Sequence, residues 1–70
     1  MKYSVQIAFL GVCRQNDGTS EFVTLEPGSV FTIRSGVRGG FVKVMYQRRM
    51  LAVFMKDVEA WAVRITEASG

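Results

Sequence analysis

Short apolar runs separated by turn residues make up most of this sequence. Residues 3–9 alternate apolar and polar side chains, which is typical of a half-buried strand, and Leu10 and Val12 then break the alternation. Further runs of β-type composition cover residues 21–25, 29–34, 41–46, 50–55 and 63–66. Helix is confined to residues 57–62, where Asp57 is a suitable cap for one turn. The pattern predicts an all-β domain of five to six short antiparallel strands, with one helical turn before the last strand.

Glycine, proline and asparagine mark the turns between these runs. The sequence Asn16-Asp17-Gly18 is a strong turn signal, because Asn and Gly tolerate positive φ angles. Pro27 presets φ for the first central position of a turn and Gly28 suits the second. Residues 26–29 are therefore expected to form a type II turn that leads directly into a strand. Residues 35–40 contain three glycines and predict a flexible loop.

The two runs at residues 41–46 and 50–55 predict a β-hairpin. With Arg48 and Arg49 as the two central turn residues, the expected core pairs are Tyr46 with Leu51, Val44 with Val53 and Val42 with Met55. The opposite face then carries Phe41, Lys43, Met45 and Gln47 beside Met50, Ala52 and Phe54. A three-residue loop that swaps the faces of one strand remains the alternative, because Arg-Arg is a poor type I′ turn. In either register, large apolar side chains point away from the core.

The order of these elements resembles that of SH3-type small barrels. The likeness covers about residues 21–65 and is carried by three segments, Glu21-Phe22-Val23-Thr24-Leu25-Glu26-Pro27-Gly28-Ser29-Val30-Phe31, Gly40-Phe41-Val42-Lys43 and Ala52-Val53-Phe54. The resemblance implies one SH3-like barrel over residues 1–66, and the last four residues, 67–70, are expected to form a frayed tail. Phe41 stands where peptide-binding members have a groove Trp, and residues 4–8 lack their Ala-Leu-Tyr-Asp-Tyr strand. Binding of proline-rich ligands is therefore not expected.

Composition indicates a small domain with more apolar residues than its core can hold. Of the 70 residues 49% are apolar, and a chain this short buries only roughly 60% of the surface that its unfolded form exposes. Cys13 is the single cysteine and there is no histidine, so neither an internal disulfide nor a protein-only zinc site is expected, and no cofactor is implied. The lone thiol and the absence of a long apolar run favour a cytoplasmic protein without a membrane span. Self-association would bury the surplus apolar surface.

Nine basic residues give the chain a net charge of +3, and six of them lie between residues 34 and 56. A basic patch beside an aromatic ring would suit a nucleic-acid backbone and a stacked base. The candidate residues for this alternative are Arg34, Arg38, Lys43, Arg48 and Arg49. The competing interpretation is that these side chains keep turns and strand edges soluble, and the modest net charge favours it.

The catalytic signals are weak. Asp57 and Glu59 are closely spaced carboxylates, but a two-residue spacing in a turn is more typical of capping than of paired acid and base. Cys13 lies beside Arg14, yet no histidine is present to act as its base. We therefore expect a non-enzymatic interaction module that self-associates, with a dimer favoured and no small-molecule substrate. The expected interface is Phe41, Met45, Met50 and Phe54.

Overall fold

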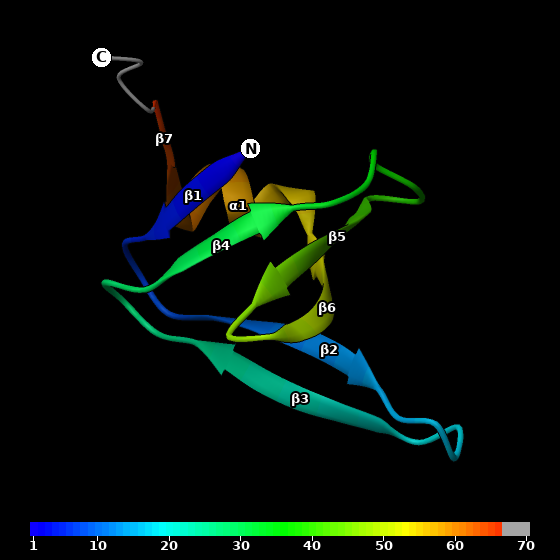
Figure 1. The fold of residues 1–70 in the computed structure, drawn as a ribbon. Coiled ribbons are helices and arrows are strands. Elements are labelled where there is room, and N and C mark those ends of the chain that lie inside the picture. The colour runs from blue at the N-terminus through cyan, green and yellow to red at the C-terminus, as the bar shows by residue number, and fades with distance from the viewer. Residues whose placement is uncertain (67–70) are drawn as a thin grey trace.

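A computed structural model describes residues 1–66 as seven antiparallel strands and one short helix (Figure 1). The elements are β1 (Lys2–Val5), β2 (Phe9–Arg14), β3 (Ser20–Leu25), β4 (Val30–Ile33), β5 (Phe41–Tyr46), β6 (Arg49–Phe54), α1 (Met55–Trp61) and β7 (Ala62–Ile65). The strand order across the sheet is β3-β2-β6-β5-β4-β1-β7. Since β3 and β7 do not pair with each other, the sheet is open. The mostly β, antiparallel class is confirmed, whereas the expected barrel of five to six strands becomes an open sheet of seven.

The N-terminal run forms two strands in place of the expected continuous one. β1 pairs with β4 and β7, whereas β2 pairs with β3 and, at Val12, with Ala52 of β6. Between β1 and β2 the backbone N–H groups of Gln6 and Ile7 both donate to the Trp61 carbonyl, at 2.8 and 3.2 Å. These bonds replace the strand ladder and divert the chain, so β2 lies in a different part of the sheet from β1.

The turn at residues 26–29 forms as expected. Gly28 has a φ of 88° and the Ser29 N–H donates to the Glu26 carbonyl at 3.2 Å. The Tyr46 hydroxyl, at the end of β5, accepts hydrogen bonds from the Glu26 N–H at 3.1 Å and from the Ser29 hydroxyl at 3.2 Å. Tyr46 therefore ties this turn to the central hairpin of the sheet.

The β5–β6 hairpin has a different register from the expected one. Tyr46 pairs with Arg49, and the two central turn residues are Gln47 and Arg48, with φ angles of 48° and 66°. Positive φ at both positions is characteristic of a type I′ turn, whose twist matches that of the flanking strands. The register thus shifts by two residues relative to the prediction. Because side chains alternate with period two, the shift leaves the residues that remain in the two strands on their expected faces. The expected pair of Val42 with Met55 is wrong, since Val42 pairs with Val53 and Met55 begins α1.

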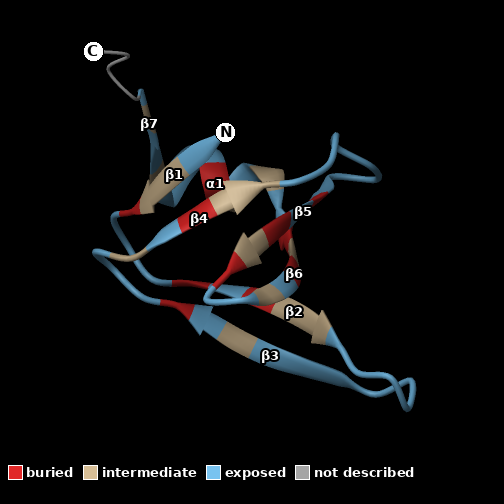
Figure 2. Cartoon of the chain, viewed as in Figure 1, coloured by how far each residue is buried: buried red, intermediate tan, exposed pale blue. Residues whose placement is uncertain are grey.

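The core lies on one side of the sheet, and Figure 2 shows its buried residues on β4, β5, β6 and α1, with exposed stretches on β3 and the loops. It comprises Val5, Phe9, Leu25, Phe31, Val42, Val44, Tyr46, Leu51, Val53 and Val58. Gly11 of β2 faces this core at close range, since a Cβ at this position would lie 2.9 Å from Val53 Cγ1. The close packing of β2 against the core at this point therefore depends on residue 11 having no side chain.

The helix covers one end of the core. It begins two residues earlier than expected, at Met55, and Asp57 lies inside its first turn, where no side chain caps the helix. Val58 is fully buried, whereas Trp61 remains partly exposed. Within the described part of the chain, no helix is both long and apolar enough to cross a membrane. The tail expected at residues 67–70 lies outside the described residues.

Candidate interaction surface

Alternate residues of β2, β3, β5 and β6 place apolar side chains on the surface opposite the core. The register aligns Phe22 with Val12 and Val12 with Ala52, across three neighbouring strands. Because side chains alternate between the two faces of a strand, residues two positions away share this surface. We name the patch the outer apolar face, and it comprises Leu10, Val12, Phe22, Phe41, Met45, Met50, Ala52 and Phe54.

The outer apolar face is exposed because the opposite side of the same strands already forms the core. In β6, Leu51 and Val53 are buried, whereas Met50 and Phe54 are exposed. Phe22 on β3 is 71% exposed, the highest value among the large apolar residues that the structure describes. Contiguous exposed apolar patches of this kind mark sites of interaction, whereas single exposed apolar residues are ordinary.

An aromatic pair lies at one end of the outer apolar face. Phe41 and Phe54 are cross-strand partners, and their ring centroids are 4.3 Å apart with planes inclined by 30°. Beside them is a hollow of about 300 Å³, lined by Leu10, Val12, Phe22, Phe41, Ala52, Phe54 and Asp57. The two rings hold each other in place, so they present a preorganised apolar surface to a partner.

The structure brings the four residues of the expected interface together on this face. Phe41 pairs with Phe54, and Met45 pairs with Met50, across the same hairpin. Phe41, Met50 and Phe54 are exposed, while Met45 is partly buried.

Sequence reasoning missed Leu10 and Phe22, which extend the face over two more strands. The break in alternation at Leu10 and Val12 was the available signal, because it places apolar residues on both sides of β2. One of these sides packs on the core through Phe9, and the other is the outer apolar face. Phe22 carried no such signal, since its position depends on the pairing of β3 with β2.

Charged residues border the outer apolar face at opposite ends. Arg14 lines a hollow of about 410 Å³ with Val12 and Met50, at one end of the strands. Asp57 lies near Phe54 at the other end, and Lys43 lies beside Ala52. Neither Arg14 nor Asp57 forms an ion pair with another described residue. Arg14 therefore borders one end of the face and Asp57 borders the other, where Arg38 also lies beside Phe41.

The five basic residues of the nucleic-acid alternative do not form a single patch. Arg38 and Lys43 line a hollow of about 630 Å³ together with Phe41, and the Arg34 N–H donates to the Lys43 carbonyl at 2.8 Å. Arg48 occupies the tip of the β5–β6 hairpin, away from this hollow. The structure therefore groups Arg34, Arg38 and Lys43 and separates the other two.

Arg49 already has a partner within the chain. Its Nη2 lies 2.7 Å from Glu21 Oε1, which also accepts a hydrogen bond from the Gln15 amide at 2.6 Å. The hydrogen bond and the charge of Glu21 raise the pKa of Arg49 above its ordinary value. Arg49 thus links β6 to β3 and is less available for a phosphate than the other arginines.

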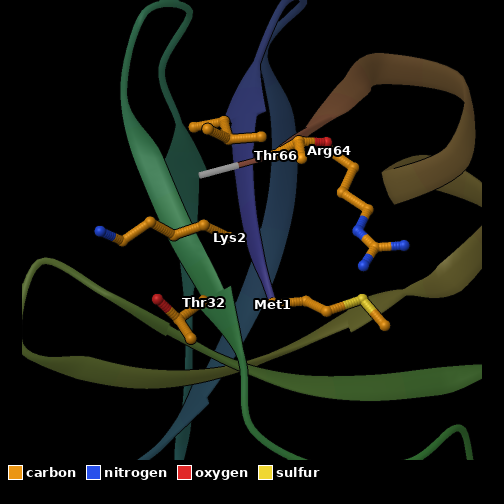
Figure 3. Close-up of a pocket in the computed structure, with 6 residues that line it drawn as sticks. Met1, Lys2, Thr32, Arg64 and Thr66 are labelled. Carbon is orange, nitrogen blue, oxygen red and sulfur yellow. The ribbon is translucent and has the colours of Figure 1, made fainter. Parts of the chain in front are cut away.

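A separate hollow of about 420 Å³ lies where β1, β4 and β7 meet (Figure 3). Met1 and Arg64 extend to one side of β1, whereas Lys2 and Thr32 extend to the other. Ligand pockets depend on a few polar groups that converge on one molecule. These side chains diverge, so the outer apolar face is the stronger candidate.

Residues 1–66 contain few side chains placed to bind a metal ion or to act as a nucleophile. The described chain has no cluster of three or more His, Cys, Asp or Glu side chains placed to hold a metal ion. Cys13 is a free, partly buried thiol on β2. Its neighbours across the sheet are Glu21 and, within hydrogen-bonding reach, Arg49. Glu21 is itself paired with Arg49, so the group joins β2, β3 and β6.

No known protein family, curated protein or solved structure matches this chain. We therefore derive its function from the arrangement of its own side chains.

Proposed function

We propose that this chain is a non-enzymatic interaction module that self-associates, as a dimer, through the outer apolar face. The observation that carries the proposal is the continuity of that face over β2, β3, β5 and β6, with the Phe41–Phe54 pair at one end. Aromatic and Met side chains are enriched at the centres of protein interfaces, where they provide adaptable apolar contact at low entropic cost. A second copy would cover side chains that this chain cannot bury itself.

The charges at the ends of the outer apolar face favour a second copy as the partner. Two such faces can pack about a twofold axis that lies between them and runs perpendicular to the strands. The strands of the second copy then run in the opposite direction to those of the first. This arrangement places Arg14 of one copy near Asp57 of the other. Arg14 and Asp57 then face each other at both ends of the interface, which favours this orientation over the parallel one.

Small size supports the same conclusion. A single core in a domain below roughly 70–80 residues rarely supplies more than about 3–5 kcal/mol of stability, so such domains often depend on disulfides, metals or oligomerisation. With one cysteine and no histidine, this 70-residue chain has oligomerisation as the remaining route. The lone thiol also leads us to place the module in a reducing compartment, the cytoplasm.

The arrangement of elements supports an SH3-like fold as part of the proposal. The β2–β3 hairpin precedes β4, β5 and β6, and α1 then leads into β7. This is the order expected from the resemblance described above. A groove for proline-rich peptides is not part of the proposal, since the rings at Phe41 and Phe54 stack on each other.

The test is the molar mass of two matched double variants, measured by sedimentation equilibrium over a concentration series. Met50→Lys/Phe54→Lys adds two charges to the outer apolar face, and we expect it to be a monomer. Val30→Lys/Val63→Lys adds the same two charges at exposed apolar positions on β4 and β7, outside that face. It should associate like the wild type. A folded Met50→Lys/Phe54→Lys variant with the wild-type mass would refute the proposal.

A second candidate function is binding of single-stranded nucleic acid at the hollow formed by Arg38, Phe41 and Lys43. Two cations beside an exposed ring suit a phosphate backbone and a stacked base. We expect affinity to fall steeply with salt and to be lost in Arg38→Ala/Lys43→Ala, but retained in Arg48→Ala. Binding that does not change with salt, or that depends on Arg48, would exclude this site.

A further inference from the structure

The edge strand β3 has a row of backbone hydrogen-bonding groups that face away from the sheet. In the β2–β3 hairpin the Gln15 N–H donates to the Thr19 carbonyl at 2.8 Å, so Gln15 and Thr19 form a hydrogen-bonded pair. This pair fixes which of the following residue pairs are hydrogen-bonded. Hydrogen-bonded and non-hydrogen-bonded pairs alternate from there along an antiparallel pair. The Cys13–Glu21 and Gly11–Val23 pairs are therefore hydrogen-bonded, whereas Val12–Phe22 is not.

The position of β6 confirms this assignment. Val12 directs its backbone groups away from β3, and it is the residue of β2 that pairs with β6, at Ala52. On β3, the corresponding groups of Ser20, Phe22 and Thr24 point to the open side of the sheet. β3 has a neighbouring strand only on the β2 side of the described sheet, so the outward N–H groups of Phe22 and Thr24 face no partner strand.

β3 also lacks the features by which natural edge strands avoid pairing. Protected edges are very short or carry Lys, Pro or a bulge. β3 has six residues, Ser-Glu-Phe-Val-Thr-Leu, with no Lys or Pro, and it pairs with β2 residue for residue without a bulge. Its one charge, Glu21, is held by Arg49 and Gln15 of the same chain. The other edge, β7, has four residues and includes Arg64.

We propose that β3 pairs in antiparallel orientation with β3 of a second copy, centred on Phe22, so that one sheet runs through both chains. Two identical strands satisfy each other here, because the outward groups of Ser20, Phe22 and Thr24 are symmetric about Phe22. Ser20 of one copy then lies opposite Thr24 of the other, and Phe22 opposite Phe22. The 71% exposed Phe22 ring is covered by its equivalent, and the outer apolar faces of the two copies become continuous.

Charge and side-chain pairing favour a second copy over an unrelated extended segment. In this register Glu21 of each copy lies opposite Val23 of the other, so no like charges face each other directly. The Ser–Thr pairs can also form a hydrogen bond across the junction. This contact depends on the backbone edge of β3, whereas the proposed function depends on side chains of the outer apolar face. Backbone variants of β3 and side-chain variants of β6 therefore test the two contacts separately.

The test removes one outward N–H group without disturbing the hairpin. Thr24→Pro eliminates an N–H that points away from β2, and proline is tolerated at such edge positions. Thr24→Ala is the matched control, because it loses the same side chain but keeps the N–H. We expect wild type and Thr24→Ala to associate equally in sedimentation equilibrium. The dissociation constant of Thr24→Pro should rise at least about tenfold, because each twofold contact loses two hydrogen bonds.

Amide hydrogen exchange measures the same contact directly. The Phe22 and Thr24 N–H groups should be protected in concentrated wild-type protein and should exchange freely on dilution. Packing of the outer apolar faces alone leaves both groups in water, so it gives no such protection. Should Thr24→Pro fail to fold, Ser20→Pro replaces it, with Ser20→Ala as its control. Ser20 is the first residue of β3, where proline is tolerated, and its N–H also points away from β2.

The outcomes separate this inference from the proposed function. Association lost in Thr24→Pro but kept in Met50→Lys/Phe54→Lys supports the β3 contact and refutes the face contact. The reverse result overturns the β3 contact and leaves the proposed function standing. If each variant leaves a smaller oligomer than wild type, both contacts exist. A wild type that is monomeric throughout, with freely exchanging Phe22 and Thr24 amides, refutes both.

Discussion

The tight packing of β2 against the core can be tested by adding one methyl group at Gly11. In Gly11→Ala the new Cβ would lie 2.9 Å from Val53 Cγ1 and 3.2 Å from the Cδ1 atoms of Leu25 and Leu51. Favourable carbon–carbon contacts have separations of about 3.5–4.0 Å. All three neighbours are fully buried, so none can move into solvent.

The magnitude follows from two opposing effects. Overpacking of this kind typically costs about 1–3 kcal/mol. Replacement of Gly by Ala also restricts the unfolded chain, which stabilises the folded state by about 0.4–1 kcal/mol. The free energy of unfolding should therefore fall by about 1–2 kcal/mol. For a domain of this size the melting temperature should fall by roughly 5–15 °C.

The assay is urea denaturation of Gly11→Ala and of a control, Gly36→Ala, followed by circular dichroism at a fixed protein concentration. A Cβ at Gly36 would have no neighbour within 4 Å, so the control should be as stable as wild type or slightly more stable. A Gly11→Ala variant as stable as wild type would refute the close packing of β2 on β6. A Gly36→Ala variant as unstable as Gly11→Ala would show that the loss at Gly11 does not come from overpacking.

Three further outcomes follow from single contacts. Tyr46→Phe should lower the free energy of unfolding by about 1–2 kcal/mol, because the Glu26 N–H loses its acceptor, and an unchanged denaturation midpoint would contradict this. Replacement of Gln47 and Arg48 by Asn-Gly should raise it by about 1 kcal/mol, since both residues have positive φ, and a less stable variant would refute the turn assignment. Hydrogen bonds from the Thr19 hydroxyl and N–H lower the pKa of Asp17 below 3.8. Their contribution to stability is therefore complete above pH 3.8 and is lost as pH falls through the lowered pKa. An NMR titration of Asp17 with a midpoint at or above 3.8 would exclude these bonds.

Local signals in the sequence were sufficient for several elements. Pro27 and Gly28 specify the turn before β4, because the ring fixes one φ angle and glycine alone readily adopts the other. The face assignment of the β5–β6 hairpin was also correct, since a period-two pattern is insensitive to a shift of two residues. For the same reason the sequence placed Phe41, Met45, Met50 and Phe54 on one face before the register was known.

The register itself depended on tertiary contacts. Arg48 and Arg49 offered no turn preference in the sequence, and the hairpin instead turns at Gln47 and Arg48. This choice places Arg49 in β6, where its guanidinium reaches Glu21 on β3. That ion pair joins residues 28 positions apart, so no local pattern could have indicated it.

The sequence by itself determined that this chain is a mostly β domain with more apolar residues than its core accommodates, because composition and alternation are local properties. Only the tertiary structure decided where the surplus lies. The pairing of β2 with β6 at Val12 sets Leu10 and Phe22 beside the central hairpin, and the lack of pairing between β3 and β7 leaves the sheet open. Both depend on pairing between strands distant in the sequence, which is governed by packing and chain topology and leaves no periodic signal in the residues themselves.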